Sequence, residues 1–262
     1  MNLSTFQNYL WIAETTLTFV LFALVFARGL HRRLPLFAAY VALLVVETVA
    51  VHWTYHHWGY TSSAARYVYW SSLGIVLLAR MLAVAELCWR SLRSSPAVWA
   101  ITRRWLALLA LALLVYALVG AARNNSPAIA LLLTAERSLD FGIVVIVFAL
   151  LRLRRRYDVW LGAVERNVLL GFAAYSAFQT VNDAFMQKWM MHYFRWWVSA
   201  SVVSFEITLL IWIAPLLRPL PPPAPPSILF SKEESVTLLM QILERMRRIA
   251  EEMKRIARSK WK

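Results

Sequence analysis

Six acidic side chains lie inside long apolar runs of this sequence, where a charge is costly. They are Glu14, Glu47, Glu136, Asp140, Asp183 and Glu206. A charge at the centre of a bilayer costs on the order of 2.5 to 10 kcal/mol or more, depending on how the cost is measured. Such side chains therefore face a protein interior or a water-filled cavity, pair with another group, or carry a proton. The cluster indicates a site without naming its ligand.

The densest part of this cluster is the segment Thr134-Ala135-Glu136-Arg137-Ser138-Leu139-Asp140. Glu136 and Asp140 are four residues apart and share a helix face, while Arg137 and Asp140 are three apart and can pair. One interpretation is an ion pair within the helix, with the second carboxylate bonded to a neighbouring helix. The other is a binding site for a substrate, an ion or a proton. The sequence leaves both open.

Other intramembrane polar residues are expected at similar depth on other helices. The predicted polar site comprises Glu14, Glu47, Arg80, Glu136, Arg137, Asp140, Gln179, Asn182, Asp183 and Glu206. This set contains six carboxylates but only two arginines. If all of these side chains point inward, four negative charges therefore lack a compensating positive charge. That excess requires protonated carboxyl groups, a bound cation or penetrating water.

Histidines give a second pattern near the predicted outer surface. His52 and His56 are four residues apart at the end of one apolar run, and His192 follows a later run. Two imidazoles at this spacing can bind one metal ion, with Asp183 as a further ligand, or can sense pH. Ordinary interfacial histidines are the alternative. Retinal is disfavoured as a cofactor, because the seventh apolar run contains no lysine for a Schiff base.

Composition places these residues in a membrane protein. The chain has 262 residues, of which 60% are hydrophobic and 16% charged, with a mean hydropathy of +0.55. A helix needs about 20 apolar residues to cross a bilayer, and seven runs of that length predict an all-α bundle of seven transmembrane helices. The predicted spans are residues 8–27, 35–56, 66–90, 98–121, 128–152, 167–188 and 194–217.

Basic residues predict the orientation of the bundle. Twelve arginines fall in the first, third and fifth connections, against four basic residues in the other three. The positive-inside rule then places the amino terminus outside and the carboxyl terminus in the cytoplasm of a multi-pass inner-membrane protein. The net charge of +14 is explained by arginines beside anionic lipid, so the expected partner is the bilayer and not nucleic acid.

The composition changes after residue 217, which predicts three parts: a transmembrane domain (1–217), a proline-rich linker (218–230) and a cytoplasmic helix (231–262). Ser231 and Glu234 form a capping-box pattern at the start of this helix. A heptad seam from Leu239 to Ile256 gives it one apolar face. Three uses are open: self-association as a coiled coil in a homo-oligomer, binding to the inner leaflet, or docking of a cytoplasmic partner.

Three short motifs carry a resemblance to a family. They are Tyr67-Val68-Tyr69-Trp70, Glu86-Leu87 and Glu136-Arg137-Ser138. Through them, residues 6 to about 190 resemble a loose group of bacterial seven-helix inner-membrane proteins. The resemblance implies the seven-helix fold, and it brings no established activity with it.

Three functions are compatible with these patterns. The leading hypothesis is a receptor-like sensor or signalling module, whose polar intramembrane site is coupled to the cytoplasmic helix. The alternative is a proton- or cation-coupled transporter or channel that uses the same carboxylates, and a second alternative is a membrane scaffold or assembly subunit. Enzyme activity has no motif in its support, because phosphate-binding loops, nucleophile elbows and HExxH are all missing from the sequence.

Overall fold

The computed structural model describes residues 5–59, 61–92, 96–122, 127–157, 162–189 and 194–218, together with four single residues near the carboxyl end. Within these residues the chain forms helices and no strand, which confirms the all-α prediction. The seven long helices are α1 (Thr5–Ala27), α3 (Pro35–Trp58), α4 (Ser63–Leu92), α5 (Pro96–Ala122), α6 (Pro127–Tyr157), α7 (Ala163–Trp189) and α8 (Phe194–Ile213). Two short elements, α2 (Leu30–Arg33) and the 3₁₀ helix η1 (Ala214–Leu216), complete the fold.

The long helices coincide with the seven predicted apolar runs but extend further at several ends. The predicted run 66–90 lies within α4, and 128–152 lies within α6, whose last turn carries arginines beyond the apolar part. Four segments of the described chain are long and apolar enough to cross a membrane: α1, α3, α4 and Val198–Leu216. These four helices support a membrane-embedded protein, and the count of seven spans stays a prediction.

The predicted linker 218–230 and tail helix 231–262 lie almost wholly outside the described residues. Within the tail, Met240, Gln241, Glu244 and Arg247 are described, and they are helical and exposed. The proposed uses of the tail therefore remain predictions.

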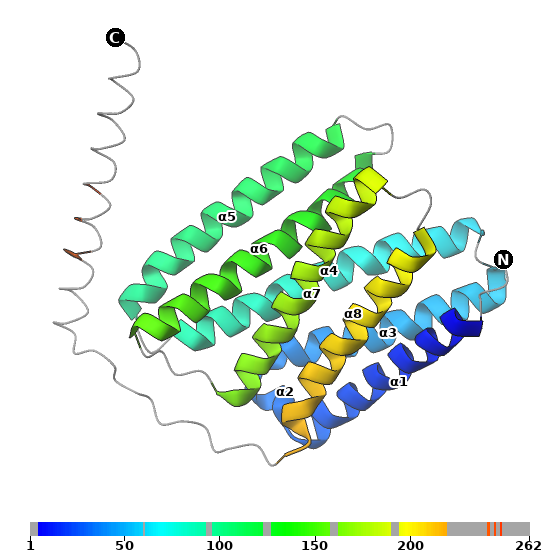
Figure 1. The fold of residues 1–262 in the computed structure, drawn as a ribbon, viewed down its shortest axis with the longest axis horizontal. Helices are drawn as coiled ribbons and strands as arrows, with labels where there is room; N and C mark the ends of the chain where they lie inside the picture. Colours follow the sequence, from blue (N-terminus) through cyan, green and yellow to red (C-terminus); the bar gives the residue numbers. More distant parts are fainter. Residues whose placement is uncertain are drawn as a thin grey trace, which may run out of the picture.

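Six of the long helices form a closed ring in the order α1, α3, α4, α6, α7, α8, with α8 packed back against α1. Helix α5 stays outside this ring, at one flank of the bundle, where it packs along α6 (Figure 1). We call the end at which α1 begins, α3 ends and α4 begins the open end, and the opposite end the closed end. This ring positions the polar residues of the predicted site.

Glycine and proline define the connections at the closed end. Gly29 has a φ of 67° and separates α1 from α2, a left-handed conformation that side chains other than glycine rarely adopt. Pro35 then starts α3, where its missing N–H is no loss because the first amides of a helix lack partners within the helix.

Glu86 of α4 supplies those missing partners for α3. Its Oε2 atom accepts hydrogen bonds from the N–H groups of Leu36 (2.9 Å) and Phe37 (3.1 Å), and Arg90 lies 3.5 Å from Oε1. A carboxylate at a helix amino terminus satisfies unpaired amides and complements the helix dipole. This contact fixes the relative position of α3 and α4 at the closed end.

The closed end is filled by a buried aromatic cluster of Phe37, Tyr40, Phe172 and Trp212, whose ring centroids lie 4.9 to 6.5 Å apart. Trp212 also donates a hydrogen bond from Nε1 to the carbonyl of Val168 (3.0 Å). Gly171 makes room for this indole, since a Cβ atom at that position would collide with the Trp212 ring.

Candidate functional site

A polar cavity of about 470 Å³ lies inside the ring and draws side chains from all six of its helices. It extends from the open end past the middle of the helices to Arg80 and to Tyr40, which also belongs to the aromatic cluster of the closed end. Its polar and aromatic lining is Trp11, Glu14, Thr15, Thr18, Tyr40, Glu47, Thr48, Tyr55, Tyr69, Arg80, Glu136, Tyr175, Gln179, Ser201 and Phe205. Four residues of the predicted polar site besides Arg80 therefore reach one cavity: Glu14, Glu47, Glu136 and Gln179.

The inner end of this cavity holds a buried ion pair. Arg80 of α4 places Nη2 3.0 Å from Oδ1 of Asp140 on α6, and the two residues are only 4% and 2% exposed. Ser176 of α7 donates a hydrogen bond to the same carboxylate oxygen (2.8 Å), and the Arg80 guanidinium lies 5.6 Å from the centre of the Tyr175 ring. The pair thus ties three helices of the ring together.

This ion pair joins two helices, whereas the pair that the sequence allowed lies within one helix. Residue spacing made Arg137 a candidate partner of Asp140, and that local pair stays a prediction. Arg137 is half-buried on α6 and is not among the described residues that line the cavity. The contact between Arg80 and Asp140 depends on the packing of α4 against α6, which spacing within one helix cannot reveal.

An amide network connects α7 with α8 at the cavity wall. Gln179 donates from Nε2 to the hydroxyl oxygens of Tyr175 (2.8 Å) and Ser201 (2.7 Å). Asn182, which is buried, donates to Oε1 of Gln179 at 3.4 Å. The predicted residues Gln179 and Asn182 are therefore joined, while the side chain of Asp183 lies outside the described residues.

The carboxylates sit on different helices around the same space. Glu47 of α3 accepts a hydrogen bond from Ser72 of α4 (3.2 Å). Glu14 of α1 lies within electrostatic range of both Glu47 and Glu206. In Glu206 of α8 the buried Oε1 atom has no hydrogen-bond partner among the described residues. Acidic groups from four helices, including Glu136 of α6, consequently converge near the cavity.

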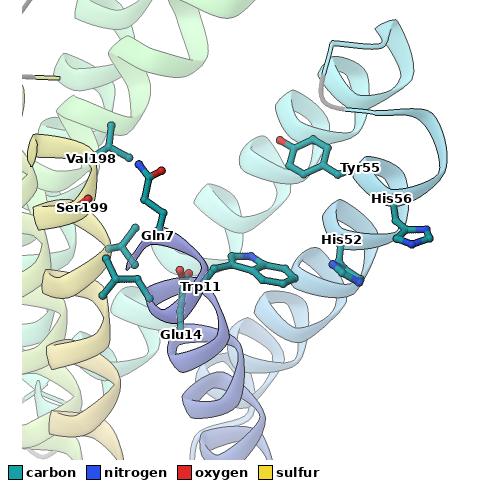
Figure 2. A pocket seen from close by; sticks show the side chains of 10 residues that line it. Gln7, Trp11, Glu14, His52, Tyr55, His56, Val198 and Ser199 are labelled. Carbon is teal, nitrogen blue, oxygen red and sulfur yellow. The ribbon is translucent and has the colours of Figure 1, made fainter. Parts of the chain in front are cut away.

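A second cavity of about 460 Å³ continues toward the open end and shares Trp11, Glu14, Tyr55 and Val202 with the first. In Figure 2 the Trp11 side chain of α1 points across this cavity toward His52 of α3. The two rings stack with their centroids 4.9 Å apart. His56 lies one turn further along α3, with its ring 6.3 Å from that of His52, close to the end of the helix (Figure 2).

The metal prediction for these histidines is not tested by this arrangement. In the part of the chain that the structure describes, no three metal-ligating side chains gather into one group. His192, the third predicted ligand, falls outside that part. His52 and His56 are therefore placed as residues that line the open end of the cavity.

Sequence reasoning missed the aromatic part of the site. Tyr40, Leu44, Glu47, Val51 and Tyr55 all line the cavity from α3, and they recur every three or four residues. That spacing marks one helix face, so it was a usable signal. Glu47 was predicted, but Tyr40 and Tyr55 were overlooked because a tyrosine in a membrane helix usually marks an interface and does not by itself indicate a site.

The charges that line the cavity define what it can bind. Among the residues that the structure describes, Glu14, Glu47 and Glu136 contribute carboxyl groups to the lining, and Arg80, which contributes a guanidinium, pairs with Asp140. A cavity of this kind attracts positively charged groups and protons more readily than anions.

No protein-family model matches this chain, and neither the curated proteins nor the solved structures include a match to it.

Proposed function

We propose that this protein is a receptor-like module of the inner membrane, which binds a small polar ligand in the cavity of its helix ring. The protein would have seven spans, with its amino terminus outside and its carboxyl terminus in the cytoplasm. The observation that carries this proposal is the cavity itself, which gathers Glu14, Glu47, Arg80, Glu136 and Gln179 from five helices. A well-formed pocket with a few converging polar groups is the usual form of a ligand site.

The contrast between the two ends of the bundle supports a receptor. The cavity opens beside residues near the start of α1 and the end of α3, and the closed end is packed with Phe37, Phe172 and Trp212. A ligand entering from the open end would reach the Arg80–Asp140 pair and contact α7 and α8 through Tyr175 and Gln179. Helix α8 leads directly toward the carboxyl-terminal tail, so a shift of α8 would change the position of the tail.

A scaffold or assembly subunit fits this cavity less well. Buried ion pairs alone could fix the register of the helices, as the Arg80–Asp140 pair does between α4 and α6. A scaffold has no need of about 470 Å³ of unfilled polar space, because close packing stabilises a protein interior better than a void does.

A proton- or cation-coupled transporter is the second candidate, favoured by the reach of the cavity to the middle of the helices. Flux into proteoliposomes under a proton gradient and a membrane potential separates it from the receptor. The full chain is compared with Glu47→Gln and Glu136→Gln, which change cavity carboxylates while leaving the Arg80–Asp140 pair intact. A flat trace in all three proteins is the result expected for a receptor. Flux that is lost in the two variants would overturn the receptor proposal in favour of transport.

Entry of the ligand from outside is tested by labelling. Val202 lines both cavities, and Val202→Cys in intact cells should react with a membrane-impermeant thiol reagent. The parent chain gives the background, since its single cysteine, Cys88, is buried. Ile207→Cys, on the exposed face of the same helix α8, is the matched control and should stay unreactive in lipid. Equal rates for the two variants would contradict an outward-facing cavity.

A further inference from the structure

A third cavity, of about 380 Å³, lies between α4, α5 and α6. Helix α5 packs along α6 but makes few contacts with α4, and the cavity occupies this flank of the bundle, on the outer side of the ring (Figure 1). Among the residues that the structure describes, it shares none of its lining with the two cavities described above. We call it the lateral cavity, and it is a site separate from the polar one.

Short and apolar side chains form most of the wall of the lateral cavity. They include Met81 and Ala85 of α4, Ala107, Ala110 and Leu114 of α5, and Ile143 of α6. Met81 and Leu114 are 45% and 53% exposed, so the cavity opens toward the outside of the bundle. Ser138 is a polar residue of the lining, but its hydroxyl oxygen has almost no accessible surface. The lateral cavity is therefore an apolar space that can be reached from the side.

A hydrocarbon chain is the occupant that suits this wall inside a bilayer. An empty space forfeits the contacts that packed atoms make. A water molecule needs several polar partners, whereas the described lining offers mainly apolar carbon atoms. An acyl chain of a neighbouring lipid can enter from the open side and restore the missing contacts.

Arg103 indicates which kind of lipid supplies the chain. It precedes Ala107 by four residues and Ala110 by seven, so it lies on the cavity-facing side of α5, one turn closer to the closed end. Arg103 is exposed and forms no salt bridge with another residue that the structure describes. The closed end is the predicted cytoplasmic end of the bundle, where arginines attract anionic lipids. A guanidinium at this position can bind the phosphate of a lipid whose chain lies in the lateral cavity.

We propose that the lateral cavity binds an anionic phospholipid of the cytoplasmic leaflet. One acyl chain fills the apolar space between α4, α5 and α6, and the charged headgroup lies at Arg103. This site goes beyond the proposed function, because it takes a different ligand on the opposite side of α4 and α6 from the polar cavity.

Photolabelling with lipids tests the proposal. The purified full chain is placed in phosphatidylcholine nanodiscs that contain a trace of a lipid with a diazirine in one acyl chain and a headgroup of either phosphatidylglycerol or phosphatidylcholine. We expect the anionic lipid to label Ala107 and Ala110 roughly fivefold more than the zwitterionic one, which is the attraction expected of one basic residue near the membrane surface. Leu108, on the exposed face of the same helix, should be labelled equally by both lipids. A ratio near one at Ala107 and Ala110 would overturn the proposal.

Two arginine variants separate a specific contact from the general positive charge of this end. Arg103→Gln should return the labelling ratio at Ala110 to about one. Arg32→Gln removes an exposed arginine of α2 at the same end of the bundle and should leave the ratio roughly fivefold. A ratio that persists in Arg103→Gln, or that falls equally in both variants, would overturn the assignment of the headgroup to Arg103.

Filling the lateral cavity tests the position of the acyl chain. Ala110→Phe and Ala85→Phe place a ring in the cavity from two different helices, and both alanines are exposed, so the ring need not displace buried residues. Each variant should lose the labelling of Ala107 by both lipids, whereas Leu108→Phe, which adds the same ring on the exposed face of α5, should keep it. Thermal unfolding identifies the variants that are folded. Unchanged labelling of Ala107 in a folded Ala110→Phe or Ala85→Phe protein would overturn the proposal.

Discussion

The two ends of the helix ring are built from the same helices, but one end is closely packed and the other encloses a cavity. At the closed end, Phe37, Phe172 and Trp212 are fully or almost fully buried, and Glu86 satisfies the first amides of α3. Toward the open end, α1, α3 and α4 instead direct Glu14, Glu47 and Tyr69 into unfilled space. This difference indicates that the residues expected to stabilise the fold lie at the closed end and those expected to bind a ligand lie toward the open end. The Arg80–Asp140 pair lies between the two regions.

The largest effect on stability is expected at that boundary. Asp140→Ala would leave Arg80 buried without its counter-charge, which costs about 3–5 kcal/mol. Unfolding of the purified protein in mixed detergent micelles measures this loss. The control is Arg80→Met/Asp140→Leu, which replaces both charges by apolar groups and should recover most of it. A double variant as unstable as the single one would show that the ion pair itself, and not the unpaired charge, determines stability.

The closed end should be intolerant of added volume. Gly171→Ala places a Cβ atom against the Trp212 ring and should destabilise the protein by about 1–3 kcal/mol through overpacking. Gly74→Ala is the matched control, because its Cβ would meet only the end of the Leu132 side chain, at 3.3 Å. Thermal unfolding of the two variants compares them, and equal losses would argue against a tightly packed closed end.

Capping of α3 by Glu86 should have a smaller effect. Glu86→Ala removes the acceptor for two amides and should cost about 1–2 kcal/mol, as the loss of a helix cap does. Arg90→Ala removes only a partly exposed ion pair and should cost less than about 1 kcal/mol. The same unfolding measurement ranks the two variants, and a larger loss for Arg90→Ala would refute capping as the main role of Glu86.

The smallest effect on stability is expected in the cavity. Glu14→Gln/Glu47→Gln removes two carboxylates that lie within electrostatic range of each other, and glutamine keeps an acceptor for Ser72. Unfolding should therefore show a loss of no more than about 0.5 kcal/mol. A large loss in this variant would mean that the cavity carboxylates are structural, and the separation between the two ends would fail.

The positions of the helices followed from the sequence because hydropathy is a local property. Runs of about 20 apolar residues predicted all seven long helices, and errors were confined to ends such as those of α4 and α6, where polar residues continue the helix. The contact between Arg80 and Asp140 did not follow. Arg80 is distant in sequence and belongs to a helix that is not the neighbour of α6 along the chain, and the local i,i+3 rule says nothing of contacts between helices.

The sequence by itself determined that the described part of this chain is helical, that four of its helices suit a bilayer and that several apolar runs carry acidic residues. Those features depend on residue type and on spacing within a single helix. The tertiary structure decided which of these groups meet: Glu14, Glu47, Arg80 and Glu136 share a cavity because the ring closes through contacts between α4 and α6 and between α1 and α8. It also decided that aromatic packing fills one end of the ring, since the order of helices in space depends on contacts between segments far apart in the chain.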